Sequence, residues 1–273
     1  MEMVKLTHEN LEKEHICCAI SGSKDPQVLS KKAWLSDRLD EGLVFLKSVQ
    51  RGKCFIEYIP AEYAWVPIDA DGFMHINCFW VSGSLKGHGY GCELLEACIE
   101  DAKAKGKKGI TVISSPKKMA FLSDPKFLSK RGFQVADTAE PYFTLLYLPF
   151  SEDVTVPKFK EHVKNPHISD KGYVLYYTAG CPFTAKYVPV IEECAAKEGV
   201  PFQSIKIDSR EKAQAAPAAW TNYALFYEWR QSTTFISVRW AWVNAALLLL
   251  LILNVFFYHC QAVFTYRCNE VAV

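Results

Sequence analysis

Residues 86–91 read Lys-Gly-His-Gly-Tyr-Gly (KGHGYG), and this glycine-rich stretch is the strongest single signal in the chain. An apolar β-type run, residues 74–81 (MHINCFWV), precedes it, and residues 92–105 follow with apolar residues at helical spacing. Gly106 stands where a helix commonly ends, and residues 109–114 form a further β-type run. The stretch is therefore predicted to be a tight connection from a strand to a helix.

Three alternate glycines, Gly87, Gly89 and Gly91, occupy this connection. Without Cβ atoms they let the backbone approach a ligand closely and adopt positive φ angles. The helix that begins here presents unpaired N–H groups and the positive end of its dipole, which favours phosphate or pyrophosphate. Lys86 adds a positive charge at the rim. A tight turn without a ligand is the alternative interpretation.

Two common phosphate-binding patterns do not fit the loop. The dinucleotide pattern Gly-x-Gly-x-x-Gly would need a third glycine where Cys92 stands, and no acid for a ribose follows residues 109–114. The Walker pattern needs Gly-Lys-Ser/Thr, which the chain lacks. What remains is a basic residue followed by x-x-Gly-x-Gly after an antiparallel strand.

Other elements are predicted around the loop. Residues 31–50 carry leucines at helical spacing and are predicted to form a helix, and residues 53–59 and 64–68 to form strands. Residues 117–130 are predicted to be helical, apart from the break at Asp124-Pro125, and residues 142–149 to form a strand.

Lys86-x-x-Gly89-x-Gly91 resembles the acyl-CoA pyrophosphate loop of GNAT-type N-acetyltransferases, usually Arg/Gln-x-x-Gly-x-Gly/Ala, and Lys130-Arg131-Gly132-Phe133 follows in the family's order. The resemblance covers about residues 1–150, and the two-part chain further resembles YoaP-type members, which append a small C-terminal domain. It implies an α/β fold of the α+β kind, the acyl-CoA N-acyltransferase fold. Its mixed, mostly antiparallel sheet would splay open after residues 74–81 and would be flanked by helices.

The resemblance also implies acetyl-CoA as a co-substrate. Its pantetheine arm would pair with the backbone of the strand before the loop, and its pyrophosphate would bind the loop amides. The cofactor-binding residues implied in this way are Phe79, Trp80, Val81, Lys86, Gly87, His88, Gly89, Tyr90 and Gly91.

The family's reaction is the direct attack of an amine on a thioester, which needs a polarised carbonyl, a base and an acid for the thiolate. The family often places a tyrosine four residues before the glycine of its Gly-Phe pair, where this chain has Leu128, so no acid is carried over. The catalytic residues stay unassigned. The candidates for the base are Glu57, Glu62, His75 and His88, and Ser114, Ser129 and Cys78 are polar residues that could lie near the thiol.

A second segment combines a strand at residues 173–178 with Cys181-Pro182-Phe183-Thr184 and a helix at residues 185–197. A cysteine at the start of a helix after a strand resembles the thioredoxin-like fold. Thr184 stands where a second cysteine would, so dithiol chemistry is disfavoured, and a monothiol role and a packing module stay open. A helix N-terminus is expected to lower the pKa of Cys181 and make it the most reactive of the ten cysteines.

The composition disfavours several function classes. A net charge of +1 gives no footprint for nucleic acid. Ten cysteines and a polar, charged N-terminus favour free thiols in a reducing cytosol, and no Cys-x-x-Cys or His-x-x-x-His spacing points to a metal. The predicted organisation is an acetyltransferase domain at 1–150, a linker at 151–171, a thioredoxin-like domain at 172–228 and a hydrophobic tail at 229–273.

The tail contains 19 uncharged residues at 240–258, about the length that crosses a hydrocarbon core of ~30 Å. Three interpretations stay open: a transmembrane helix that anchors the chain, a buried helix, and a natural C-terminus replaced by unrelated sequence. We expect a chain that ends near Tyr227 to be more soluble than the full chain and to keep acetyl-CoA binding.

The sequence thus predicts an acetyl-CoA-dependent N-acetyltransferase that acts on an unidentified small-molecule or peptide amine. The alternative is a non-catalytic CoA- or thiol-binding adaptor, which the tail would tether to a membrane if it is an anchor. The predicted location is the cytoplasm, with membrane contact through the tail.

Overall fold

The structure of the protein is a computed structural model that describes residues 1–19, 22–119, 121–166, 168–227 and 230–231. The predicted membrane-spanning segment, residues 240–258, lies outside the described residues. Within the described ranges, no helix combines the length and the hydrophobicity that a membrane crossing needs.

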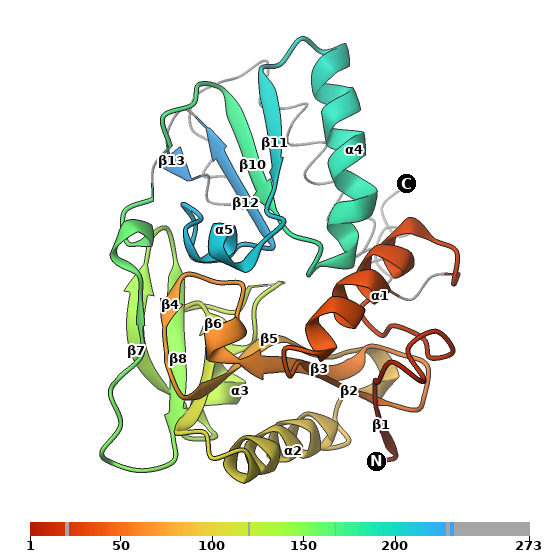
Figure 1. The fold of residues 1–273 in the computed structure, drawn as a ribbon, viewed down its shortest axis with the longest axis vertical. Coiled ribbons are helices and arrows are strands. Elements are labelled where there is room, and N and C mark those ends of the chain that lie inside the picture. Colours follow the sequence, from red (N-terminus) through yellow and green to blue (C-terminus); the bar gives the residue numbers. More distant parts are fainter. Residues whose placement is uncertain (20–21, 120, 167, 228–229, 232–273) are drawn as a thin grey trace, which may run out of the picture.

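A seven-stranded sheet forms the larger part of the molecule, in the order β1-β2-β3-β5-β6-β8-β7 (Figure 1). Every neighbouring pair is antiparallel except β5 and β6, so the predicted mixed, mostly antiparallel sheet is confirmed. Its strands are β1 (Met3–Lys5), β2 (Val44–Ser48), β3 (Cys54–Pro60), β5 (Phe73–Val81), β6 (Gly109–Ser114), β7 (Gln134–Ala139) and β8 (Phe143–Pro149).

The sheet opens in its middle. β5 pairs with β3 along its whole length, from Met74 to Val81, whereas it pairs with β6 only over residues 73–76. A register shift between Glu57 and Tyr58 of β3 interrupts the β3–β5 ladder at the point where β6 departs. One backbone edge of β5, residues 77–81, is therefore left without a strand partner among the residues that the structure describes.

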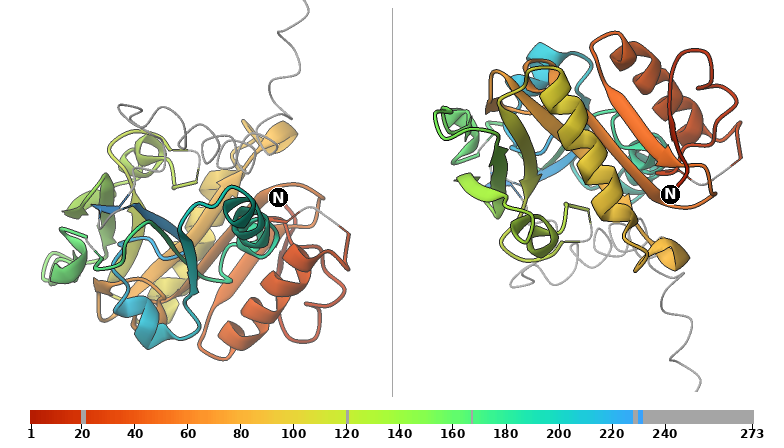
Figure 2. Two further views of the ribbon diagram at one scale, coloured as in Figure 1. Left: turned by 90° about the horizontal axis from the view of Figure 1, so that it is seen from above. Right: turned by 90° about the horizontal axis from the view of Figure 1, so that it is seen from below.

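Helices cover the two faces of this sheet. α2 (Tyr90–Ala104) runs across one face and packs its buried residues Leu94, Leu95, Cys98 and Ala102 into that side of the core (Figure 2). α1 (Pro26–Leu39) lies on the opposite face, with Asp25 as its N-cap accepting from the amide of Gln27. The short α3 (Pro125–Ser129) begins at a second aspartate cap, Asp124.

The structure corrects three predicted elements. The helix predicted over residues 31–50 ends at Leu39, and its second half is strand β2. Of the strand predicted at 64–68, only Ile68 is part of a strand, β4 (Ile68–Asp69), which pairs with β9 (Lys158–Phe159). Of the helix predicted at 117–130, only α3 forms in the described residues, because the Asp124 cap and Pro125 start a helix rather than continue one.

A second sheet lies on the α1 side of the molecule, with strand order β11-β10-β12-β13 (Figure 1). β10 and β11 are parallel and are joined by α4. β12 is antiparallel to β10, and β13 is antiparallel to β12. We call residues 168–227 and 230–231 the C-terminal unit. Its elements are β10 (Tyr173–Tyr177), α4 (Pro182–Lys197), β11 (Phe202–Lys206), α5 (Arg210–Gln214), β12 (Tyr223–Tyr227) and β13 (Arg230–Gln231).

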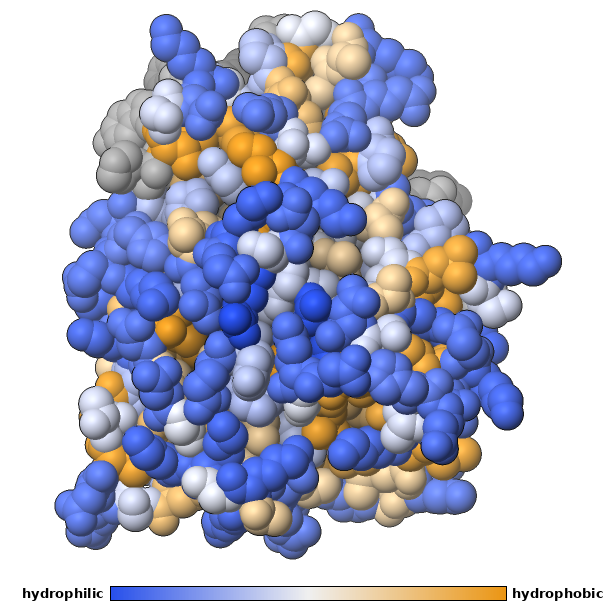
Figure 3. All heavy atoms as spheres, in the orientation of Figure 1, coloured by the Kyte–Doolittle hydropathy of each residue, from blue (hydrophilic) through white to orange (hydrophobic). Residues whose placement is uncertain are grey.

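The C-terminal unit packs directly on the larger sheet and on α1. One continuous cluster of buried side chains contains Leu35 and Phe45 together with Ala213 and Ala219. Polar contacts add to it, because the Thr221 hydroxyl donates to the Trp65 carbonyl at 2.5 Å and the Gln214 amide donates to the Ala64 carbonyl at 3.3 Å. The outer surface contrasts with this buried apolar contact, since hydrophilic side chains cover most of the middle of the face in Figure 3.

Candidate active site

The glycine loop begins α2 as the sequence predicts. Gly89 is the N-cap of α2 with φ +80°, and Gly87 has φ +84°, so both lie in the left-handed region that favours glycine. Among the described residues, a Cβ atom added at either position would meet nothing within 4 Å, and no side chain caps the helix. The first amides of α2 are therefore not covered by the described part of the chain, and an anionic ligand can bind them.

The other predicted loop residues are placed around this opening. Lys86 is exposed at the rim. The His88 ring stacks on Tyr90, with ring centroids 5.5 Å apart, and His88 Nε2 lies 3.1 Å from the Ser84 carbonyl oxygen. Gly91 packs closely, because a Cβ there would lie 3.3 Å from the ring of Phe127.

The open edge of β5 leads from this loop into the molecule. Its side chains alternate between two environments: Phe79 and Val81 pack on the α2 side, and Cys78 and Trp80 face the opposite side. Phe79 also contacts Phe127 edge to face, with ring centroids 5.4 Å apart. The backbone of residues 79–81 is thus held between two packed faces while its edge stays unpaired.

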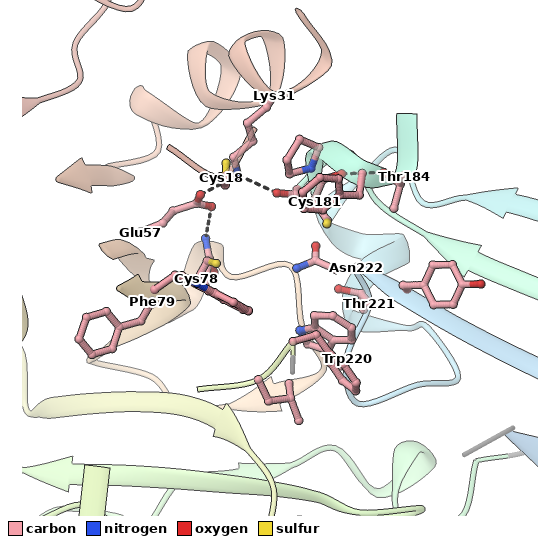
Figure 4. A pocket seen from close by; sticks show the side chains of 18 of the residues that line it. Cys18, Lys31, Glu57, Cys78, Phe79, Cys181, Thr184, Trp220, Thr221 and Asn222 are labelled. Carbon is pink, nitrogen blue, oxygen red and sulfur yellow. Dashed lines mark hydrogen bonds and ion pairs between the residues drawn. The ribbon is translucent and has the colours of Figure 1, made fainter. Parts of the chain in front are cut away.

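A cavity of about 240 Å³ lies on the Cys78 and Trp80 side, between the larger sheet and the C-terminal unit (Figure 4). β3, β5 and α1 contribute Glu57, Cys78 and Lys31, and the C-terminal unit contributes Cys181 and Thr184 at the start of α4. The loop before β12 closes it with Trp220, Thr221 and Asn222.

A buried ion pair stands in the wall of this cavity. Lys31 Nζ lies 2.6 Å from Glu57 Oε2, and the side chains are 1% and 2% exposed. Lys31 also donates to the Gly180 carbonyl at 2.7 Å, and Asn77 Nδ2 donates to Glu57 Oε1 at 3.2 Å. Burial alone would lower the pKa of Lys31, but the Glu57 carboxylate, together with the neighbouring Cys18 and Cys78, outweighs burial and raises that pKa. Lys31 is therefore an ammonium group in the cavity wall.

Three thiols, Cys18, Cys78 and Cys181, line the same cavity. Cys181 is the N-cap of α4, as its predicted place at a helix start requires, but its predicted low pKa is wrong. Burial raises the pKa of the Cys181 thiol more than the amides of Phe183 and Thr184 lower it. Burial likewise raises the pKa of Cys78 to about 12. At Cys181, the helix N-terminus therefore does not offset the rise in thiol pKa that burial causes.

The other candidate bases are not placed for catalysis in this cavity. Glu62 lies at the surface, where it accepts from the Gly72 amide at 2.8 Å and from Lys107 at 3.1 Å. His75 lines the cavity, but burial lowers its pKa to about 3, and its Nδ1 lies 3.0 Å from the Thr111 hydroxyl. Among the predicted candidates, Glu57 is the carboxylate that reaches the cavity.

Three further candidates have structural surroundings. Leu128 is fully buried in the core beneath α2, so the family's tyrosine position holds a packing residue. The Ser114 hydroxyl donates to the Ser123 carbonyl at 2.7 Å, and the exposed Ser129 hydroxyl donates to the Lys126 carbonyl.

Several residues of the cavity could not be found from the sequence. Lys31 reads as one charge on a helix that also contains Lys32, and no local pattern separates the buried lysine from an exposed one. Trp220 and Asn222 lie far along the chain from β5. The signal that could have indicated them is the tryptophan-rich composition, and it gives no position.

Comparison with known proteins identifies the family. A model of the GNAT acetyltransferase family matches residues 8–121, and a YoaP-like family model matches residues 201–238. The Bacillus subtilis (strain 168) protein YoaP, named as an uncharacterised N-acetyltransferase, is 46% identical over 228 residues, which cover 83% of this chain and 91% of that protein.

Two solved structures are similar at a lower level. The PaiA N-acetyltransferase of Thermoplasma acidophilum, in complex with coenzyme A, has 16% identity and a TM-score of 0.38 over 55% of this chain and 100% of its own. A GNAT family acetyltransferase of Brucella melitensis, in complex with acetyl-CoA, has 13% identity and a TM-score of 0.36 over 58% of this chain and 92% of its own.

The likeness to YoaP covers most of both chains and shows the family. The chain belongs to the GNAT acetyltransferases, of the kind that carries a YoaP-like segment. It is therefore an acyltransferase of the N-acetyltransferase class.

Proposed function

We propose that the chain transfers an acetyl group from acetyl-CoA to a primary amine, with the thioester bound between the open edge of β5 and the cavity. The observation that carries the proposal is the continuity of three features: a helix N-terminus free of side-chain caps, an unpaired strand edge, and a cavity that contains a carboxylate. Each supplies one need of the reaction.

The binding residues follow the predicted set. The amides of residues 87–91 would hold the pyrophosphate, with Lys86 at the rim, and the side chains of His88 and Tyr90 would flank it. The pantetheine arm would add to the open edge of β5 by backbone hydrogen bonds at Phe79, Trp80 and Val81. Backbone N–H groups of this edge would also polarise the acetyl carbonyl.

Glu57 is the proposed base. The amine of the acceptor reaches the cavity as an ammonium ion and must lose a proton before it attacks the carbonyl carbon. The Glu57 carboxylate would take that proton, and the Lys31 ammonium and Asn77 amide hold it in position. The neutral amine forms the C–N bond with the carbonyl carbon, the C–S bond then breaks, and the second amine proton passes to the departing CoA thiolate, which leaves as the thiol.

The test is Glu57→Gln, with Glu62→Gln as the matched control, since Glu62 is the acidic candidate on the surface. We expect Glu57→Gln to lower kcat by about 100-fold or more while the Kd for acetyl-CoA stays within about twofold. Glu62→Gln should change neither quantity. Equal kcat values in the two variants would remove Glu57 from the role of base.

One observation favours a second function, a non-catalytic CoA-binding adaptor. The acid position of the family is a buried leucine, Leu128, so the protonation of the leaving thiolate lacks its usual donor. Single-turnover analysis of acetyl-CoA with an amine panel separates the two functions, because an adaptor binds acetyl-CoA without forming an acetylated amine.

Finer features of the C-terminal part are also proposals. The division at residues 150 and 171 and a thioredoxin-like identity for residues 172–228 are supported by the β10–α4–β11 crossover and by the antiparallel strands that follow. In this reading Thr184 replaces a second cysteine, and its hydroxyl donates to the Thr178 carbonyl at 2.8 Å. A cytoplasmic location, and membrane contact through residues 240–258, rest on the sequence alone; sedimentation of the full chain with liposomes tests the contact.

A further inference from the structure

We propose that the C-terminal unit forms half of the acceptor pocket and that the acceptor is a compact aromatic monoamine. This inference rests on the proposed function, because it assigns the amine to the same cavity. It gives the YoaP-like segment a role in substrate recognition rather than in thiol chemistry.

The walls of the cavity come from both parts of the chain. On one side stand Phe55 and Trp80 of the larger sheet with Trp34 of α1, and on the other stand Phe183 of α4 and Trp220. Lys53 joins the two sides, since its Nζ lies 5.8 Å from the Trp80 ring centroid and 5.6 Å from that of Phe183. An acceptor that reaches Glu57 must therefore lie against residues of the C-terminal unit.

The wall on the C-terminal side is held by hydrogen bonds rather than left as a loose loop. The Thr178 hydroxyl donates to Asn222 Oδ1 at 2.6 Å and accepts from the Gly180 amide at 3.2 Å. Thr221 is tied to the Trp65 carbonyl. A pocket with fixed walls selects by shape.

Size and lining indicate a compact aromatic body. The cavity measures about 240 Å³, below the ~300–1,000 Å³ of sites for drug-sized ligands. Many of the lining side chains are aromatic, and such faces bind a ring by offset or edge-to-face contact. Aromatic residues of both parts contribute to it, among them Trp34, Phe55, Trp80, Phe183, Tyr187 and Trp220.

Charge argues against a polyamine or an aminoglycoside. Among the described residues that line the cavity, Glu57 is the single carboxylate, and it already pairs with Lys31. Lys53 adds a second cation. A substrate with two or more ammonium groups would bring its extra charge beside lysines with no carboxylate to receive it.

The experiment measures kcat/KM of the full chain for matched acceptors, with the acetylated product quantified by mass spectrometry. The reference is 2-phenylethylamine. 2-Cyclohexylethylamine removes the aromatic ring, L-phenylalanine adds a carboxylate, and spermidine and a tetrapeptide with a free N-terminus represent the other acceptor classes.

We expect 2-phenylethylamine to exceed spermidine and the tetrapeptide by about 100-fold, and the cyclohexyl analogue by a smaller factor. Comparing kcat/KM for L-phenylalanine with that for 2-phenylethylamine shows whether the pocket accepts an aromatic amino acid or an aromatic amine without a carboxylate. Spermidine or the peptide reacting as well as the aromatic amine would overturn the proposal. So would no reaction of any aromatic amine while acetyl-CoA binds, whereas failure of acetyl-CoA to bind would overturn the proposed function itself.

The share of the C-terminal unit is tested by Phe183→Ala, with Val190→Ala on the exposed face of the same helix as the control. We expect Phe183→Ala to raise KM for 2-phenylethylamine by about tenfold and to leave acetyl-CoA affinity unchanged. Val190→Ala should change neither. Trp220→Leu is the second variant, and normal KM values in both cavity variants would refute the assignment.

Discussion

Gly89→Val is the sharpest test of the acetyl-CoA site, because α2 provides its own control. Gly89 begins this helix at φ +80°, and Gly106 follows its end at φ +67°. In both cases an added Cβ meets nothing within 4 Å, so the fold opposes neither side chain by contact. The 15 residues of α2, about 22 Å of helix, lie between the two positions.

The magnitude follows from strain and from lost ligand contacts. A β-branched residue forced to positive φ costs about 1–3 kcal/mol at either position, which a domain of about 5–15 kcal/mol stability survives. Only at Gly89 does the side chain occupy the space where the pyrophosphate would approach the amides. Loss of one or two charge-assisted hydrogen bonds, about 3 kcal/mol in total, corresponds to about a hundredfold weaker binding.

The assay is isothermal titration calorimetry with acetyl-CoA, beside thermal melts of both variants. We expect Gly89→Val and Gly106→Val to lower Tm by similar amounts, and only Gly89→Val to lose affinity. If the two variants bind acetyl-CoA equally well, the glycine loop is a turn without a ligand, and the proposed binding residues are wrong.

Two further outcomes follow from burial. Iodoacetamide should modify the exposed Cys92 before Cys181, and Cys181 should react only as the pH rises above the usual thiol range, because burial raises its pKa; peptide mapping of the labelled chain that finds Cys181 first would contradict this. Leu128→Tyr should not restore an acid but should destabilise the core by about 1–3 kcal/mol, and a rise in kcat without a fall in Tm would show that position 128 faces the substrate.

The sequence predicted the elements around the loop because their signals are local. The glycines, the apolar run before them and the helical stripe after them lie within about 30 residues, and the structure places β5 and α2 there. The left-handed φ angles of Gly87 and Gly89 could also be predicted locally, since glycine is the residue that adopts such angles readily.

The helix predicted over residues 31–50 failed for a physical reason. Both faces of β2 and of the residue before it are covered: Leu43 and Phe45 pack on the α1 side, and Val44 packs on the α2 side. A strand buried on two faces shows no alternation of apolar and polar residues, so its leucines continue the spacing of the preceding helix by chance. Gly42, at φ +87°, lies in the turn that separates α1 from β2.

The charged centre of the site could not be predicted because it is assembled from distant segments. Lys31 meets Glu57 across the packing of α1 on β3, and it meets the Gly180 carbonyl across 149 residues of chain. No periodicity or motif connects these positions. Only the packing of the C-terminal unit on α1 brings them together.

That assembly gives the C-terminal unit an electrostatic part in the site. A buried ion pair is stable only where its remaining donors and acceptors are satisfied, since desolvation otherwise outweighs the attraction. The Lys31 ammonium forms an ion pair with Glu57 and donates a hydrogen bond to the Gly180 carbonyl. A Cβ at position 180 would lie 2.6 Å from Asn222 Oδ1, so glycine is what allows the backbone to approach this closely. The lysine that holds the proposed base therefore has its Gly180 partner only when the C-terminal unit is packed on α1, which links folding of the YoaP-like part to the chemistry of the acetyltransferase sheet.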